Sequence, residues 1–181
     1  MLHGSQRIPH NMIEFMILSA PRSGSTWASV WLTTDTTLCV HDPLWTRHYS
    51  ELDAIEEKGK AIGLSCTGLA LFPDWVNAHP ARKIVLHRDH KEINESLALI
   101  GFSPREEIWD GMLDRINGIH RPWKDLFNTE AAKDIYEHLL QIPFDEARHS
   151  HLREVEMQPK FAGLTVGKEV TNRLITELRS I

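Results

Sequence analysis

Small and hydroxyl-bearing residues follow the first apolar segment of the chain, in an order suited to binding an anion. The apolar run at residues 15–19 leads through Ala20 into a loop that reads Pro21, Arg22, Ser23, Gly24, Ser25, Thr26 and Trp27. A strand that passes through such a loop into a helix directs free N–H groups and the positive end of the helix dipole toward one point. Gly24 lets the backbone approach a ligand closely, and the loop hydroxyls can donate hydrogen bonds. The pattern therefore predicts a site for phosphate or a similar anion.

The loop differs from the GxxxxGK[ST] loop of nucleoside triphosphatases at the position of the lysine. Ser25 stands where that lysine would contact the outer phosphates of ATP, and the positive charge lies two residues before Gly24, at Arg22. ATP hydrolysis is therefore not expected. Small-residue connections between a strand and a helix also occur without any ligand, so the loop alone leaves a purely structural role open.

A second cationic motif follows the clearest strand pattern of the chain, at residues 83–87. Arg88 comes directly after it, and Asp89 with Glu92 forms a D-x-x-E pattern that begins a helix. Ser96 lies on this helix, eight residues after Arg88. Open parallel sheets bind ligands at the carboxyl ends of their strands, so Arg88 is well placed for an anion. Two other roles are open: Arg88 can pair with Asp89 or Glu92, and Ser96 can face solvent.

Together the two motifs resemble the sulfotransferase family, which uses 3'-phosphoadenosine-5'-phosphosulfate (PAPS). The loop of that family has the form P-[KR]-S-G-[ST]-T-W, which residues 21–27 match, and a later strand ends in an Arg with a Ser eight residues on, as Arg88 and Ser96 do. The resemblance covers residues 15–96 and continues more loosely at residues 123–127 and 142–152. It implies that the loop binds the 5'-phosphosulfate end of PAPS, and that Arg88 and Ser96 hold the 3'-phosphate.

The resemblance further implies sulfuryl transfer to a hydroxyl or amine acceptor, with 3',5'-adenosine bisphosphate (PAP) as product and no metal required. Arg22 would stabilise the leaving phosphate, and Arg22 and Arg88 would hold the two anionic ends of the nucleotide apart. The cytosolic branch has a catalytic His after the strand that precedes the Arg-bearing strand, but residues 62–68 contain none. His41, just after another expected strand, is the candidate base, with Asp42 as a carboxylate alternative. His41 can equally cap a turn.

Two other functions stay open from the sequence. One is a P-loop nucleotide kinase or phosphotransferase that uses ATP and magnesium, against which the missing lysine counts. The other is a catalytically inactive PAPS- or PAP-binding protein, in keeping with the missing His. The acceptor is not specified, because the irregularly spaced tryptophans can line an aromatic or sugar site or belong to the core: Trp31, Trp45, Trp75, Trp109 and Trp123.

These motifs need a scaffold that brings strand ends together. Strand patterns lie at residues 15–19, 37–40, 61–65 and 83–87, and helix patterns at residues 25–32, 50–58, 73–77 and after Asp89. Such alternation predicts a parallel sheet with helices on both faces. Later helix patterns lie at residues 106–115, 131–140, 145–156 and 168–178, with a short strand near residues 118–120. We therefore expect an α/β, P-loop-type three-layer fold with about four to five parallel strands and a mainly helical C-terminal half.

Composition limits the partners and the compartment. The chain of 181 residues carries a net charge of −5, so neither nucleic acid nor an acidic membrane is an expected partner. We expect a single domain over residues 1–181, with residues 1–12 poorly ordered, and the oligomeric state is not specified. The chain has no bilayer-length apolar run and no secretory signal pattern at its start, so a cytoplasmic location is expected.

Cysteine and histidine usage gives no sign of a disulfide or a metal site. Cys39 and Cys66 lie in apolar, strand-like segments and are expected to be buried thiols. The chain has 11 histidines, but they show no HExxH or other paired ligand spacing. Surface or capping roles are expected for them.

Overall fold

The structure is a computed structural model that describes residues 12–102 and 108–155. Its centre is a five-stranded sheet in the order β2-β3-β1-β4-β5, with every neighbouring pair parallel. The strands are β1 (Ile13–Ser19), β2 (Thr37–His41), β3 (Ala61–Cys66), β4 (Arg82–His87) and β5 (Ile119–Pro122). The predicted α/β three-layer fold with a parallel sheet is confirmed.

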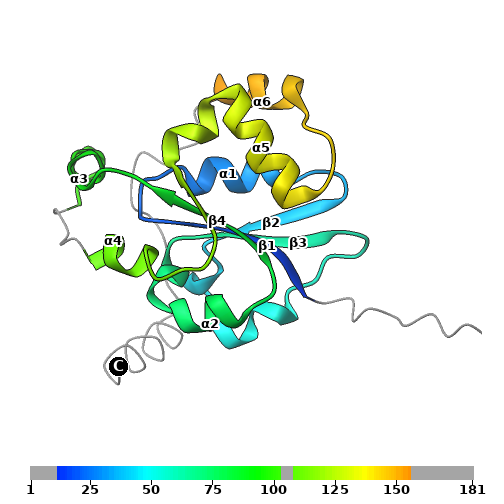
Figure 1. Ribbon diagram of the computed structural model, residues 1–181, viewed down its shortest axis with the longest axis horizontal. Helices are drawn as coiled ribbons and strands as arrows, with labels where there is room; N and C mark the ends of the chain where they lie inside the picture. Colours follow the sequence, from blue (N-terminus) through cyan, green and yellow to red (C-terminus); the bar gives the residue numbers. More distant parts are fainter. Residues whose placement is uncertain (1–11, 103–107, 156–181) are drawn as a thin grey trace, which may run out of the picture.

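Helices cover both faces of this sheet (Figure 1). The α-helices are α1 (Ser25–Leu32), α2 (Pro73–Ala78), α3 (His90–Ala98), α4 (Ile108–Leu113), α5 (Thr129–Leu140) and α6 (Glu146–Arg153). Short 3-10 segments connect them: η1 (Pro43–Trp45), η2 (Tyr49–Ala54), η3 (Gly68–Leu71) and η4 (Trp123–Phe127). Figure 1 shows α1, α5 and α6 on one face of the sheet and α2 on the other.

The central strand β1 alternates its side chains between two cores. Met16 and Leu18 pack into the cluster that includes residues of α2 and η3, whereas Phe15 and Ile17 pack into the cluster of α1 and α5. All four side chains are essentially inaccessible to solvent. Because both faces of the strand are covered, its sequence is apolar without a polar alternation. Packing on both faces holds β1 in place in the sheet, and with it the start of the loop that follows.

One expected helix is wrong. The 3-10 segment η2 begins at a capping box between His48 and Glu51 and ends at Ala54, and residues 55–58 form an irregular segment that leads into a turn. Leu52 is buried and Ile55 packs against the same core. Apolar residues three positions apart share one face of a 3-10 helix, and the polar residues 56–60 offer no stripe to support further α-helical turns.

Other expected elements agree with the structure within a few residues, where the structure describes them. The strand expected near residues 118–120 is β5, at the edge of the sheet. The helix expected over residues 168–178 and nearly all of the segment 1–12 lie outside the described ranges.

The side chain of Arg148 in helix α6 binds the C-terminal end of α1. The guanidinium of Arg148 donates to three carbonyl oxygens there, those of Val30, Trp31 and Thr33, at 2.8, 3.3 and 2.7 Å. The last carbonyl groups of a helix have no N–H partner within the helix, and a cation there also complements the negative end of the helix dipole. Arg148 thus fixes the helix that begins at the candidate loop.

The structure bears on two expectations from composition, buried thiols and the lack of a bilayer-length apolar segment. Cys39 and Cys66 are both buried and unpaired, as expected, and burial raises the pKa of each thiol. In residues 12–102 and 108–155, no helix combines the length and the apolar character needed to cross a bilayer.

Gly63→Ala is expected to destabilise the sheet. A methyl group at Gly63 of β3 would lie 2.0 Å from the ring of Phe15 on the neighbouring strand β1. Overpacking of this kind costs about 1–3 kcal/mol, which urea unfolding followed by tryptophan fluorescence will measure. Phe15→Leu should recover part of the loss in the Gly63→Ala background.

Gly111→Ala serves as the matched control for this substitution. Gly111 lies on α4, and no described atom lies within 4 Å of a Cβ placed there. The change is therefore expected to be neutral or slightly stabilising, because alanine favours a helix over glycine. Equal stabilities of Gly63→Ala and the unmodified protein would contradict the packing of Phe15 against β3.

Candidate anion-binding site

The loop between β1 and α1 has a backbone conformation that most residues avoid. Arg22 and Gly24 both have positive φ, 64° and 85°. A Cβ at Gly24 would lie 2.8 Å from Cδ1 of Leu126, so both the conformation and the available space require glycine. Gly24 is the N-cap residue of α1 and has no side chain to accept hydrogen bonds from the first-turn N–H groups. These groups are therefore available to a ligand.

Ser23 carries an unsatisfied polar group inside this loop. The residue is fully buried, and its Oγ has no hydrogen-bond partner among the described residues. Buried hydroxyl groups in proteins are nearly always paired, because an unpaired one costs about 1–3 kcal/mol. An acceptor atom from a bound ligand would satisfy this group, which agrees with the predicted anion site.

His41 lies against the hydroxyl side of the loop. Its Nε2 is 3.2 Å from Ser25 Oγ, 3.2 Å from Thr26 Oγ1 and 3.3 Å from Oδ2 of Asp42. The His41 side chain is 35% exposed, so a ligand at the loop can reach it. The sequence placed His41 just after the second strand at the loop edge; it is in fact the last residue of β2, and it does lie at that edge.

Asp42, the alternative base, is engaged elsewhere. Its Oδ1 accepts hydrogen bonds from the backbone N–H of Thr67 at 2.7 Å and from the Thr67 hydroxyl at 3.0 Å. The carboxylate therefore connects the end of β2 to the turn after β3 and holds Oδ2 beside His41. This geometry suits Asp42 to orienting His41.

The two expected cationic positions form one cluster. Nε of Arg22 donates to Ser96 Oγ at 3.0 Å, and Nη1 of Arg88 donates to the backbone carbonyl of Arg22. Burial, and then the nearby charge of Arg88, lower the pKa of the Arg22 guanidinium. Arg22 and Arg88 were expected to hold the two anionic ends of a nucleotide apart; in the structure Arg88 reaches the backbone of Arg22, and Ser96 contacts the Arg22 side chain directly. Adjacent cations of this kind produce a local region of positive potential in a chain of net negative charge.

Arg88 is oriented by residues of α3 and η4. Its Nε donates to the Glu92 carboxylate at 3.3 Å, and its guanidinium lies 4.2 Å from the centroid of the Trp123 ring. Glu92 also accepts from Trp123 Nε1 at 3.2 Å and from Lys124 Nζ at 2.8 Å. The sequence left open that Arg88 pairs with Glu92, four residues on, and the structure shows this ion pair. Trp123 and Lys124 are partners that the sequence did not predict.

The side chain of Trp27 does not share the setting of the other predicted cofactor residues. It is 5% exposed, and its indole N–H donates to the carbonyl of Leu152 at 3.0 Å. Its ring packs 5.1 Å from that of Trp31 and 5.0 Å from that of Phe127, measured between centroids. The Trp27 side chain therefore anchors α1 in the core, and only its backbone belongs to the loop.

Two hydroxyl residues near the end of β3 support the site, although the sequence did not predict a role for them. Ser65 is fully buried and donates from Oγ to the carbonyl of Ser25 at 2.8 Å, while Thr67 holds Asp42 as described. Both lie in residues 62–68, the segment searched for a catalytic His. Their position at the carboxyl end of a strand next to β1 is the signal that could have identified them.

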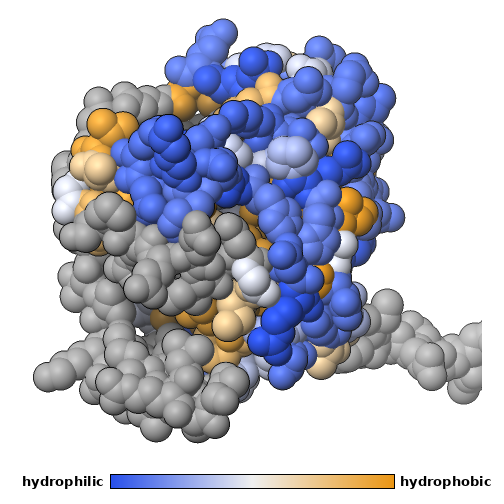
Figure 2. All heavy atoms as spheres, turned by 60° about the vertical axis from the view of Figure 1, so that its left-hand side comes forward, coloured by the Kyte–Doolittle hydropathy of each residue, from blue (hydrophilic) through white to orange (hydrophobic). Residues whose placement is uncertain are grey.

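The surface on this side of the molecule is mostly polar. Figure 2 turns the α3 side of Figure 1 toward the viewer, and most of the surface coloured there is hydrophilic, with a smaller hydrophobic area beside it. A charged ligand suits such a surface better than an apolar one.

No family of known proteins matches this sequence, no curated protein is significantly similar to it, and no solved structure matches the fold. A function for the chain therefore depends on the residues and geometry of the site itself.

Glu92→Gln is expected to destabilise the protein at neutral pH, with a difference that shrinks in acid. The hydrogen bond from Lys124 is the main cause that lowers the pKa of the Glu92 carboxyl below its ordinary 4.5. A carboxyl with a lower pKa in the folded than in the unfolded chain contributes stability above about pH 4.5 and loses it as pH falls through the folded-state pKa. Urea unfolding at about pH 7 and about pH 3 will measure the difference.

Glu95→Gln is the control for this pair of measurements. Glu95 lies on the same helix, is 65% exposed and approaches Lys91 only to 4.0 Å, so its loss should change stability little at either pH. A difference between Glu92→Gln and the unmodified protein that stays constant from neutral to acid pH would count against the role of the carboxylate.

Proposed function

We propose that the protein binds PAPS at the loop between β1 and α1 and transfers its sulfuryl group to a hydroxyl or amine acceptor, releasing PAP. The observation that carries this proposal is the left-handed loop at Arg22 and Gly24. Among residues 12–102 and 108–155, it leaves the buried Ser23 hydroxyl without a partner and gives the first-turn N–H groups no side-chain cap, next to the cluster of Arg22, Arg88 and Ser96. The match of residues 21–27 to the sulfotransferase loop supports PAPS as the ligand.

A nucleotide with two anionic ends suits this arrangement. The first turn of α1 offers N–H donors to a phosphosulfate, and the guanidinium groups on the α3 side offer charge-assisted hydrogen bonds to a 3'-phosphate. Trp123 and Glu92 orient Arg88, which reduces the entropy lost when Arg88 binds the phosphate. The hydroxyl of Ser25, where ATP-binding loops carry lysine, instead contacts His41. This favours PAPS over ATP.

In the proposed reaction the acceptor oxygen or nitrogen attacks sulfur in line with the leaving phosphate oxygen. The bond between sulfur and that oxygen breaks, and its electron pair stays with PAP. Nε2 of His41 lies 3.3 Å from the Asp42 carboxylate, which can only accept, so Nε2 carries the ring proton and Asp42 orients the imidazole. The lone pair of His41 Nδ1 takes the proton of the acceptor. Arg22 stabilises the charge that develops on the leaving phosphate, because a guanidinium stays charged and does not itself donate the proton.

We also propose a cytoplasmic location for this activity. Two unpaired, buried cysteines, Cys39 and Cys66, are in keeping with a reducing compartment.

Arg88→Ala is expected to weaken PAP binding about 10- to 100-fold, the effect of losing one or two hydrogen bonds to a charged group. Isothermal titration calorimetry with PAP, in buffer without divalent metal, will measure the affinity. Arg82→Ala is the matched control, because Arg82 lies at the opposite end of the same strand, β4, and contacts Glu14. Its PAP affinity should be unchanged.

The same calorimetry tests the competing functions. A titration with ATP and magnesium that gives higher affinity than PAP would favour a kinase or phosphotransferase. If PAP shows no binding, or binds Arg88→Ala as tightly as the unmodified protein, the proposed nucleotide site is wrong.

His41→Ala is expected to lower sulfuryl transfer about 10²- to 10⁴-fold, the usual contribution of a positioned general base, while PAP affinity stays the same. Mass spectrometry of a panel of hydroxyl and amine acceptors incubated with PAPS will detect the added sulfuryl group. His138→Ala, on α5, is the control and should keep full transfer. Full transfer by His41→Ala would remove His41 from the mechanism, and PAP binding without transfer to any acceptor in the panel would favour the inactive binding protein.

A further inference from the structure

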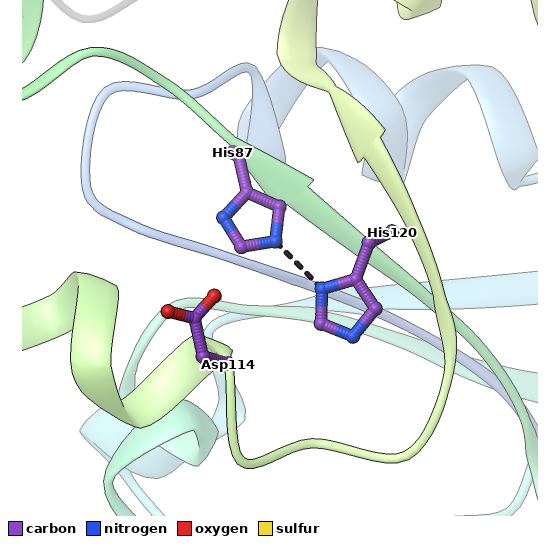
Figure 3. A group of neighbouring side chains, drawn as sticks. All are labelled: His87, Asp114 and His120. Atoms are coloured by element: carbon purple, nitrogen blue, oxygen red, sulfur yellow. Dashed lines mark hydrogen bonds between the residues drawn. The ribbon is translucent and has the colours of Figure 1, made fainter.

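Three metal-ligand side chains meet beside the candidate nucleotide site. His87 is the last residue of β4, His120 lies in β5, and Asp114 follows α4 directly. One ligand atom from each lies within 4.8 Å of the other two. Figure 3 shows a ring nitrogen of His87 directed toward a ring nitrogen of His120, with the Asp114 carboxylate beside His87. Histidine spacing in the sequence could not predict this group, because its members come from three different elements.

A backbone carbonyl determines which nitrogen of His120 is available. Nε2 of His120 lies 3.0 Å from the carbonyl oxygen of Ile116, and a carbonyl can only accept a hydrogen bond. Nε2 therefore carries the proton, and the lone pair of the neutral ring is on Nδ1. Ligating histidines commonly donate their second ring nitrogen to a carbonyl in this way, which fixes the tautomer and ring orientation.

The lone pair of His120 Nδ1 points at His87. The distance from His120 Nδ1 to His87 Nε2 is 2.7 Å, so His87 donates this hydrogen bond. A metal ion can take the place of that hydrogen when His87 changes tautomer and carries its proton on Nδ1. The rings then need to rotate so that both lone pairs meet at one point, and to move apart from 2.7 Å to the separation of about 3.3 Å set by two ligands of a tetrahedral zinc ion.

The turn that carries Asp114 is fixed against the rest of the fold. Asn77 of α2 donates from Nδ2 to the carbonyl of Arg115 at 2.8 Å and accepts from the N–H of Asn117 at 2.7 Å. At Gly118 the turn comes so close to β4 that a Cβ would lie 3.2 Å from the carbonyl oxygen of Lys83. Among the described residues, the Asp114 carboxylate has no ion pair or hydrogen bond, so it is available to a ligand.

Nearby cations are balanced by their own partners. His87 and His120 line an open cavity of about 450 Å³ together with Arg88 and Arg121. Arg88 pairs with Glu92 at 3.3 Å, and Arg121 lies 3.8 Å from Asp134. The cavity gives solvent access to the two histidines, and Asp114 is itself exposed, which leaves a position for water in the coordination of a metal ion.

We propose that His87, Asp114 and His120 form a binding site for a divalent transition metal, with zinc as the preferred ion. Two imidazole nitrogens and one carboxylate oxygen are typical zinc ligands, and three protein ligands leave the fourth position open to water. The site goes beyond the proposed sulfuryl transfer, which requires no metal, and it does not depend on PAPS binding.

Calorimetric titration of the full chain, first freed of metal with a chelator, tests this site with ZnCl₂. Co²⁺ serves as a second probe, because the visible absorption of bound Co²⁺ reports tetrahedral coordination. We expect one ion in this site. His87→Ala and His120→Ala should abolish the Co²⁺ signal, and Asp114→Asn should weaken binding at least about tenfold, since even the outer partners of such ligands contribute 10- to 100-fold in affinity.

His151→Ala is the matched control, an exposed histidine on α6, and it should bind zinc as the unmodified protein does. Zinc binding that is absent, or that persists unchanged in His87→Ala and His120→Ala, would overturn the proposal. If circular dichroism shows that a histidine variant does not fold, Asp114→Asn decides, because it changes only an exposed carboxylate to an amide of the same shape. Unchanged affinity in Asp114→Asn would then overturn the three-ligand site.

Discussion

The hydrogen bonding of β1 between β3 and β4 brings the anion loop next to the ends of its two neighbouring strands. Its parallel register pairs Leu18 with Cys66 and Ser19 with Leu86, so the three strands end at about the same level. The anion loop follows β1, and the supporting hydroxyl residues and Arg88 follow the other two strands. Residues far apart in the sequence therefore meet at one edge, and any shift in register would separate them.

The segment η4 links the shape of the loop to the orientation of its cations. Leu126 packs so closely over Gly24 that no Cβ fits there, while Trp123 and Lys124 of the same segment contact Arg88 and Glu92. A single short segment thus limits the backbone of the loop and positions a guanidinium beside it. The shape of the candidate anion loop and the packing of the core therefore depend on the same segment.

The sequence predicted the elements better than the contacts. The alternation of strands and helices, the loop after β1 and the position of His41 at the same sheet edge all follow from local pattern. The direction of the Arg22 side chain does not, because it depends on the left-handed backbone at that residue, and it brings Arg22 to Ser96. Trp27 shows the same limit: its place in the motif predicted a contact with the cofactor, whereas its side chain packs in the core.

Helix α1 directs the positive end of its dipole at the candidate loop and the negative end at Arg148. The guanidinium of Arg148 meets its last carbonyl groups, more than a hundred residues along the chain from the loop at its start. Under the proposed function, an anion at the first turn and this cation at the last turn would each be stabilised by the helix dipole, and the two opposite charges would also attract each other along the helix. Such an attraction is reciprocal, so ligand affinity and the docking of α6 would be thermodynamically linked. A substitution that loosens α6 would therefore act as a remote modulator of anion binding, through the electrostatics of a single helix.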